Sequence, residues 1–202
     1  MHVRTSVALA VAALIAAPFS ASAQAKRGTR TQTTPQATTT GGGLSIGGFI
    51  GYESGDLAGL SLRVDGELPI QQLSPQIALS FVGSVGYTHF SEDIAFGDIK
   101  FNIFKLIPAA RFTLPVNPQI DLYGDAGLGL YYYSFTTTQT LPFFGTVKDT
   151  GSGTGLMMRF AAGGFFKVNP KMKIGAEIGI LPYFNKVDTT DFSIGVGAMF
   201  LL

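Results

Sequence analysis

Residues 60–68 read Leu-Ser-Leu-Arg-Val-Asp-Gly-Glu-Leu. The even positions carry leucine, valine or glycine, whereas the odd positions carry serine or a charged residue. Successive side chains of a β-strand point to opposite faces, so the segment is predicted to be a strand with one apolar and one charged face. A helix would mix these residues around its circumference.

Seven further segments show the same alternation of apolar and polar residues. They span residues 44–53, 77–88, 99–114, 120–133, 156–167, 172–181 and 192–202. The face that carries the apolar residues has no charged position in any of them, when the 99–114 segment is counted from Phe104. A charge on a lipid-facing strand position costs about 2–4 kcal/mol at the bilayer midplane, so we expect these faces to contact lipid.

In lipid, an open sheet edge would leave backbone groups unpaired, so such a sheet must close on itself. The sequence therefore predicts an all-β protein, an eight-stranded antiparallel up-and-down transmembrane β-barrel over residues 44–202. The alternative is a water-soluble eight-stranded sandwich, in which the apolar faces would pack against each other.

The N-terminal residues read as a targeting segment followed by a tail. Residues 1–23 have a basic start, an apolar core over 7–17 and the small-residue sequence Ala21-Ser22-Ala23, which together are typical of a secretory signal peptide. Residues 24–43 are rich in threonine, glutamine and glycine and lack large apolar side chains. Such a segment cannot bury enough surface to fold, so we expect a disordered periplasmic tail.

Composition excludes several functions. The chain has 202 residues, of which only 13% are charged, and its net charge is +1. This balance argues against nucleic-acid binding, which needs a basic excess. Because there is no cysteine and there are only two histidines, we expect no thiolate or histidine metal site and no cofactor.

The connections between the predicted strands differ in length. Three turns are predicted to face the periplasm. Those at 115–119 and 168–171 are short and contain Asn-Pro, and the third spans 69–75. The loops predicted to face the outside of the cell span residues 54–57, 89–98, 135–155 and 182–190. Short periplasmic turns with longer outer loops are typical of outer-membrane barrels. Aromatic residues near the strand ends are expected to form an interfacial girdle; they are Tyr52, Tyr87, Phe90, Tyr131, Tyr132, Tyr133, Tyr183 and Phe184.

Two stretches carry a more specific resemblance. Residues 107–130, IPAARFTLPVNPQIDLYGDAGLGL, resemble the central hairpin of small outer-membrane β-barrel proteins of the OmpA-barrel, OmpX and OmpW type. Residues 191–200, DFSIGVGAMF, resemble the C-terminal strand that the barrel-assembly machinery reads, although Leu201 and Leu202 follow the usual terminal aromatic residue. The resemblance implies a monomer in the cell outer membrane, in contact with its lipids and lipopolysaccharide.

Charged residues on the inward parity are expected to form a polar network in the lumen. They are Arg63, Asp65, Glu67, Arg111, Asp121, Asp125, Lys105, Arg159, Lys173 and Glu177. Arg111 and Asp121 flank one turn on the same face, so we expect them to pair. The network is read as a salt-bridged plug, since eight-stranded barrels usually fill their interior. The alternative is a narrow polar pore between the inward glycines.

One short motif suggests catalysis. His89-Phe90-Ser91 resembles the His-x-Ser motif of lipid A deacylase barrels, which implies that serine attacks an ester and histidine takes its proton. A third member is lacking, because Glu92 and Asp93 are too near and position 103 is isoleucine. We therefore expect a non-enzymatic envelope protein with a structural or surface-interaction role. A narrow channel for small or hydrophobic solutes is the alternative, and a lipid A esterase is a remote one.

Overall fold

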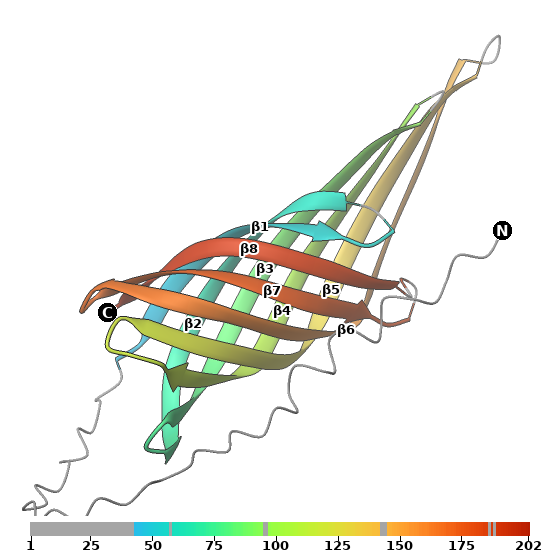
Figure 1. Cartoon of the computed structure of the whole chain (residues 1–202). Helices are drawn as coiled ribbons and strands as arrows, with labels where there is room; N and C mark the ends of the chain where they lie inside the picture. The colour runs from blue at the N-terminus through green and yellow to red at the C-terminus, as the bar shows by residue number, and fades with distance from the viewer. Residues whose placement is uncertain (1–42, 57, 95–96, 142–144, 186, 188) are drawn as a thin grey trace, which may run out of the picture. The chain divides into compact units, whose positions relative to one another are not determined.

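The computed structural model describes residues 43–202 except 57, 95–96, 142–144, 186 and 188. The predicted signal peptide, and the predicted tail apart from residue 43, lie outside the described residues. Eight antiparallel strands form one closed barrel in chain order (Figure 1). Their bounds are β1 Ser45–Ser54, β2 Ala58–Ser74, β3 Ile77–Ile94, β4 Gly97–Pro115, β5 Ile120–Leu141, β6 Gly145–Asn169, β7 Met172–Tyr183 and β8 Thr189–Leu201.

The first and last strands close the barrel. β1 pairs with β2 on one side and with β8 on the other, in an unbroken register from Ser45↔Leu201 to Ser54↔Phe192. Each strand thereby has two hydrogen-bonded neighbours through the body of the barrel, as a sheet in lipid requires. None of the described residues forms a helix long and apolar enough to cross a membrane.

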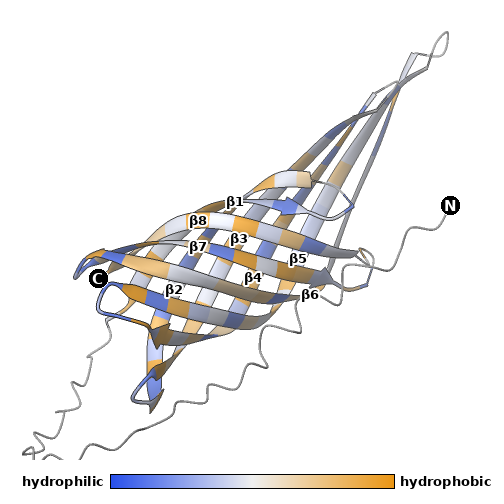
Figure 2. Ribbon diagram, in the orientation of Figure 1, coloured by the Kyte–Doolittle hydropathy of each residue, from blue (hydrophilic) through white to orange (hydrophobic). Residues whose placement is uncertain are grey.

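The predicted alternation is present along the strands (Figure 2). On the outer surface, Leu62, Val85 and Ile178 are 56%, 60% and 64% exposed. On the inner surface, Arg111 and Arg159 are 0% and 2% exposed. The apolar parity faces outward and the charged parity faces inward, which is the inverse of a soluble sandwich. The predicted fold class is therefore confirmed.

Two Asn-Pro turns are built in the same way. The side-chain oxygen of Asn117 accepts hydrogen bonds from the backbone N–H groups of Gln119 and Ile120, both at 2.9 Å. Asn169 accepts one from the N–H of Lys171 at 2.8 Å. Asparagine side chains stabilise turns by such local bonds. These turns lie at the end of the barrel that also holds the start of β1 and the end of β8, here named the turn end.

At the opposite end, named the hairpin end, two predicted loops are mostly strand. The segment predicted as a loop at 89–98 belongs largely to β3 and β4, and the segment predicted at 135–155 belongs largely to β5 and β6. The prediction was wrong because it required apolar residues on the outer parity. Polar residues take their place there: His89 and Ser91 in β3, and threonine in β5, at Thr136 and Thr138 for example, where its β-branched side chain favours a strand. β3–β6 therefore run on beyond the barrel as a projecting sheet (Figure 1).

The predicted aromatic girdle was correct only in part. Tyr52 and Tyr132 lie on the outer surface with 46% and 45% exposure, and Tyr87 lies on the same parity. Four others lie at strand positions that face the lumen, and their side chains are at most 8% exposed: Phe90, Tyr131, Tyr133 and Tyr183.

Candidate functional site

Six charged side chains form a ring of ion pairs across the barrel interior. Arg111 of β4 makes a bidentate contact with Asp125 of β5, at 2.8 and 2.9 Å. Asp125 also accepts a hydrogen bond from Arg159 of β6 at 2.8 Å. Strands β4, β5 and β6 are therefore joined through the lumen as well as through their backbones.

The ring continues through β7 and closes on β2. Arg159 donates to Glu177 of β7 at 2.8 Å, and Glu177 accepts from Arg63 of β2 at 2.8 Å. Arg63 donates to Asp65 at 2.8 Å, and Asp65 lies 3.5 Å from Arg111, where the ring began. Three arginines alternate with three carboxylates, so the ring carries no net charge.

Burial makes this pairing necessary. The side chains of Arg111, Asp65 and Asp125 are 0% exposed. An ion that leaves water for such an interior loses several kcal/mol of solvation unless partners replace the water. Further hydrogen bonds complete the set, since Ser84 donates to Asp65 at 2.7 Å and Tyr123 donates to Glu177 at 3.0 Å. The ring is thus a network in which each charged side chain contacts an opposite charge across the lumen.

Further predicted network residues lie beside the ring. Glu67 lies 3.0 Å from Arg111 and 3.8 Å from Lys173. Lys105 pairs with Glu53, a buried carboxylate that also accepts a hydrogen bond from Thr88. Glu53 is absent from the predicted network, although it has the inward parity of its strand.

The predicted pair of Arg111 and Asp121 is wrong. The turn places Pro115 opposite Asp121, and the same register places Asp125 opposite Arg111. Asp121 instead accepts a hydrogen bond from Lys167 at 2.8 Å. The two residues flank one turn, but they are not at equal distances from it.

An aromatic layer covers the ring toward the turn end. Phe49, Tyr123, Phe165 and Met199 form a buried cluster. The Arg111 guanidinium lies 4.4 Å from the centre of the Tyr123 ring, a distance suited to a cation–π contact. Three inward glycines provide the space for these rings, because a Cβ on any of them would come within 2.6 Å of a ring atom: Gly163, Gly175 and Gly197. The inward glycines therefore accommodate side chains.

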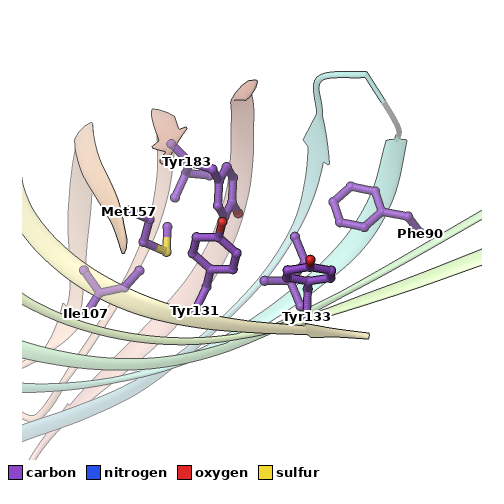
Figure 3. Packing of buried hydrophobic residues seen from close by; sticks show 8 residues of the cluster. Phe90, Ile107, Tyr131, Tyr133, Met157 and Tyr183 are labelled. Atoms are coloured by element: carbon purple, nitrogen blue, oxygen red, sulfur yellow. The ribbon is translucent and has the colours of Figure 1, made fainter. Parts of the chain in front are cut away.

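A second buried layer lies toward the hairpin end (Figure 3). It contains Phe90, Ile103, Ile107, Tyr131, Tyr133, Met157, Leu181 and Tyr183. The rings of Tyr131 and Tyr183 meet edge to face with centroids 5.1 Å apart. A cavity of about 30 Å³ remains between Lys105 and the ring of ion pairs. Within the described residues, no group of three histidine or carboxylate side chains is placed to hold a metal ion.

His89 and Ser91 lie on the outer surface, and both are exposed. The Nδ1 atom of His89 lies 2.7 Å from Oδ1 of Asn102, the residue opposite it on β4. The same oxygen accepts a hydrogen bond from the hydroxyl of Tyr87 at 2.7 Å. In this part of the described structure, an amide rather than a carboxylate is therefore the partner of His89.

A closed ring of strands with an apolar outer surface and a salt-bridged interior defines an integral β-barrel of the outer membrane. The chain matches the family described as "Outer membrane protein beta-barrel domain" over residues 6–200. It belongs to that family, and its strands contact outer-membrane lipids. No curated protein sequence matches the chain.

Solved structures agree with this fold. Neisserial surface protein A shares 16% identity, with 79% of this chain and 96% of that chain covered and a TM-score of 0.55. A major outer membrane protein from Thermus thermophilus shares 11% identity, with 79% and 99% covered and a TM-score of 0.57. The outer membrane enzyme PagL shares 15% identity, with 78% and 99% covered and a TM-score of 0.51. At these identities the likeness shows the fold alone.

Proposed function

We propose that this protein is a non-enzymatic membrane anchor with a closed lumen, which holds a β-sheet at the cell surface for interaction with other molecules. The observation that carries the proposal is the ring of ion pairs, defined by Arg63, Asp65, Arg111, Asp125, Arg159 and Glu177. The ring and the two layers of large side chains beside it occupy the path that a solute would take.

The orientation of the barrel supports a surface role. The turn end has short connections, and the hairpin end carries the projecting sheet of β3–β6. In outer-membrane barrels the short turns face the periplasm and the long connections face outward. The projecting sheet would then stand outside the cell, while the filled barrel holds it in the membrane.

Planar-bilayer recordings test the closed lumen. We expect silence from the refolded full chain, and ion conductance from an Arg63→Ala/Arg159→Ala variant, because two of the three cations of the ring are then missing. An equivalent change of exposed lysines, Lys100→Ala/Lys148→Ala, is the matched control and is expected to be silent. Migration of unheated samples on gels verifies that each variant is folded. Stable conductance steps from the wild-type chain would instead favour the narrow channel.

A further inference from the structure

A second group of buried charges lies in the lumen, on the hairpin-end side of the ring of ion pairs. Lys105 of β4 pairs with Glu53 of β1 there, and Asp191 of β8 lies beside them. Glu53 and Asp191 are only 6% and 4% exposed. Together with the buried Tyr183 of β7, these side chains form what we name the mouth cluster, because it lies where the lumen opens toward the hairpin end.

The charges of the mouth cluster are not balanced. Two carboxylates share one ammonium group, whereas three arginines match three carboxylates in the ring. The ammonium group of Lys105 contacts Glu53, which also accepts a hydrogen bond from Thr88 at 3.0 Å. Within the described residues the side chain of Asp191 has no hydrogen bond and no ion pair, and the exposed Asp56 of the β1–β2 turn adds a further negative charge nearby. A buried carboxylate without a cation of its own is costly in its charged form, so its protonated form is favoured.

Asp191 lies at the end of the closed part of the barrel. The β1–β8 ladder ends at Ser54↔Phe192, and Asp191 is the residue before Phe192, so it precedes the membrane-spanning part of β8. A Cβ on Gly55 would collide with the carboxylate of Asp191, so the β1–β2 turn packs directly against it. Burial and, after it, the carboxylate of Glu53 raise the pKa of Asp191 to about 6.

The hydroxyl group of Tyr183 is the remaining polar group of the mouth cluster. The side chain is 1% exposed, and its hydroxyl has no hydrogen-bond partner within the described residues. Burial, together with the carboxylates of Glu53 and Asp191, raises the pKa of Tyr183, and the Nζ atom of Lys105 lies 5.8 Å from the centre of its ring. Buried polar groups normally have a partner, so the hydrogen bonds of the cluster are incomplete in this arrangement. A cavity of about 30 Å³ beside Glu53 and Lys105 leaves room for these side chains to change partners.

We propose that Glu53 and Asp191 form a proton-binding site that tightens the mouth of the barrel in mildly acidic surroundings. One proton from water binds to the carboxylate of Asp191, which then donates a hydrogen bond to Glu53, and the pair carries one negative charge instead of two. The single cation of Lys105 then balances that charge. At higher pH the proton returns to water, and two carboxylates repel each other where β8 meets the β1–β2 turn.

The direction of the pH dependence follows from linkage between proton binding and folding. A carboxyl group whose pKa is raised in the folded state binds its proton more tightly there than in the unfolded chain, where the ordinary value for aspartate is 3.8. The stability that this group contributes is present in full below pH 3.8 and is lost as the pH rises through about 6. Carboxylates held charged by an ion pair act in the opposite direction, so this site is distinguishable from the ring.

Carbon-13 NMR of the refolded full chain in lipid nanodiscs, labelled at its aspartate carboxyl carbons, measures the titration directly. The signal of Asp191 is the one that is missing from the Asp191→Asn variant. We expect a midpoint near pH 6 in the wild-type chain, a lower one in Glu53→Gln and a higher one in Lys105→Met, because the two neighbouring charges shift it in opposite directions. Migration of unheated samples on gels verifies that each variant is folded. A wild-type midpoint at about pH 4, or the same midpoint in all three chains, would overturn the proposal.

The stability of Asp191→Asn gives a second measurement. Urea titration in lipid vesicles at pH 7.5 and pH 5 compares it with the wild-type chain, and Asp149→Asn, which changes an exposed carboxylate of the projecting sheet, is the matched control. At pH 7.5 we expect Asp191→Asn to be the more stable chain, and its advantage, as a ratio of unfolding equilibrium constants, to shrink about tenfold at pH 5. The ratio for Asp149→Asn is expected to agree at the two values of pH within about twofold.

Two results of this titration would contradict the proposal. A less stable Asp191→Asn chain at pH 7.5 would mean that the charged carboxylate has a stabilising partner. An advantage of Asp191→Asn that does not change with pH would mean that the folded chain binds no additional proton at this site.

Discussion

Arg111 shows how a single residue determines the state of the interior. Its guanidinium contacts Asp125, Glu67 and Asp65 at 2.8–3.5 Å and is 0% exposed. Guanidinium is planar and presents several donors in fixed directions, so it can hold three carboxylates at once. Without it, three buried carboxylates would each lose a cationic partner, and a buried charge with fewer partners is costly.

The substitution Arg111→Met tests this at the residue scale. Removal of one partner from a buried ion network costs about 3–5 kcal/mol, so we expect the free energy of unfolding to fall by that amount. Lys100 pairs with Asp98 at 3.3 Å but is 55% exposed, and Lys100→Met is expected to cost at most about 1 kcal/mol. Urea titration of the barrel in lipid vesicles measures both. Equal losses would mean that Arg111 does not hold the network together.

The β5–β6 hairpin combines large aromatic side chains on one strand with glycines on the other. Gly155 lies opposite Tyr131, and a Cβ on it would lie 2.4 Å from the Tyr131 ring. The same ring extends inward, where its hydroxyl donates to the carbonyl oxygen of Phe184 at 2.9 Å. The glycines on the inner parity of β6 are thus the reason that rings of β5 can lie flat across two strands.

Gly155→Val is the corresponding change at the element scale. The added side chain must displace the Tyr131 ring, and overpacking of this kind costs about 1–3 kcal/mol. Thr154→Val, on the exposed outer parity of the same strand, is the control. We expect faster amide exchange in the hairpin for Gly155→Val and little change for the control. An unchanged exchange rate in Gly155→Val would show that the ring has room to move.

At the scale of the whole molecule, the outer surface changes from apolar residues on the barrel body to hydroxyl-bearing residues on the projecting sheet. The outer parity of the barrel body carries apolar residues such as Val85, which is 60% exposed. On the projecting sheet the same parity carries Thr136, Thr138 and Thr150. Exposed apolar surface of this extent is stable only against lipid, whereas a hydroxyl surface is stable in water. We infer from this change that one boundary of the bilayer lies between the barrel body and the projecting sheet.

Arginine substitutions at two heights on this surface test the placement. Val85→Arg lies in the apolar region, where a charge costs about 2–4 kcal/mol, falling to about 0–1 near the interface. Thr138→Arg lies on the same face of the projecting sheet and is expected to leave stability unchanged. Unfolding in lipid vesicles measures the difference. Equal tolerance of both changes would contradict a membrane position for the barrel body.

Much of this architecture follows from the sequence, because the pleat of a strand fixes which residues share a face. The alternation at 60–68 assigns Arg63 and Asp65 to one side and Leu62 and Val64 to the other, and lipid on the apolar side requires a closed sheet. The same alternation places all ten predicted network residues, and Glu53, on the side of their strands that faces the lumen. The strands of the projecting sheet were not predicted, since polar residues on the outer parity, such as Ser91 and Thr136, replace the apolar signal.

The ion pairs inside the barrel depend on the closed three-dimensional arrangement of the strands. Local sequence suggested Arg111 with Asp121, but the register set by the Asn117 turn places Arg111 opposite Asp125. Contacts such as Arg63 with Glu177 join strands that are far apart in the chain. They depend on closure of the barrel and on side chains that reach across the lumen, so no pattern within one strand specifies them. The face on which a residue lies is set by its own strand, whereas its ion-pair partner is set by the closed barrel.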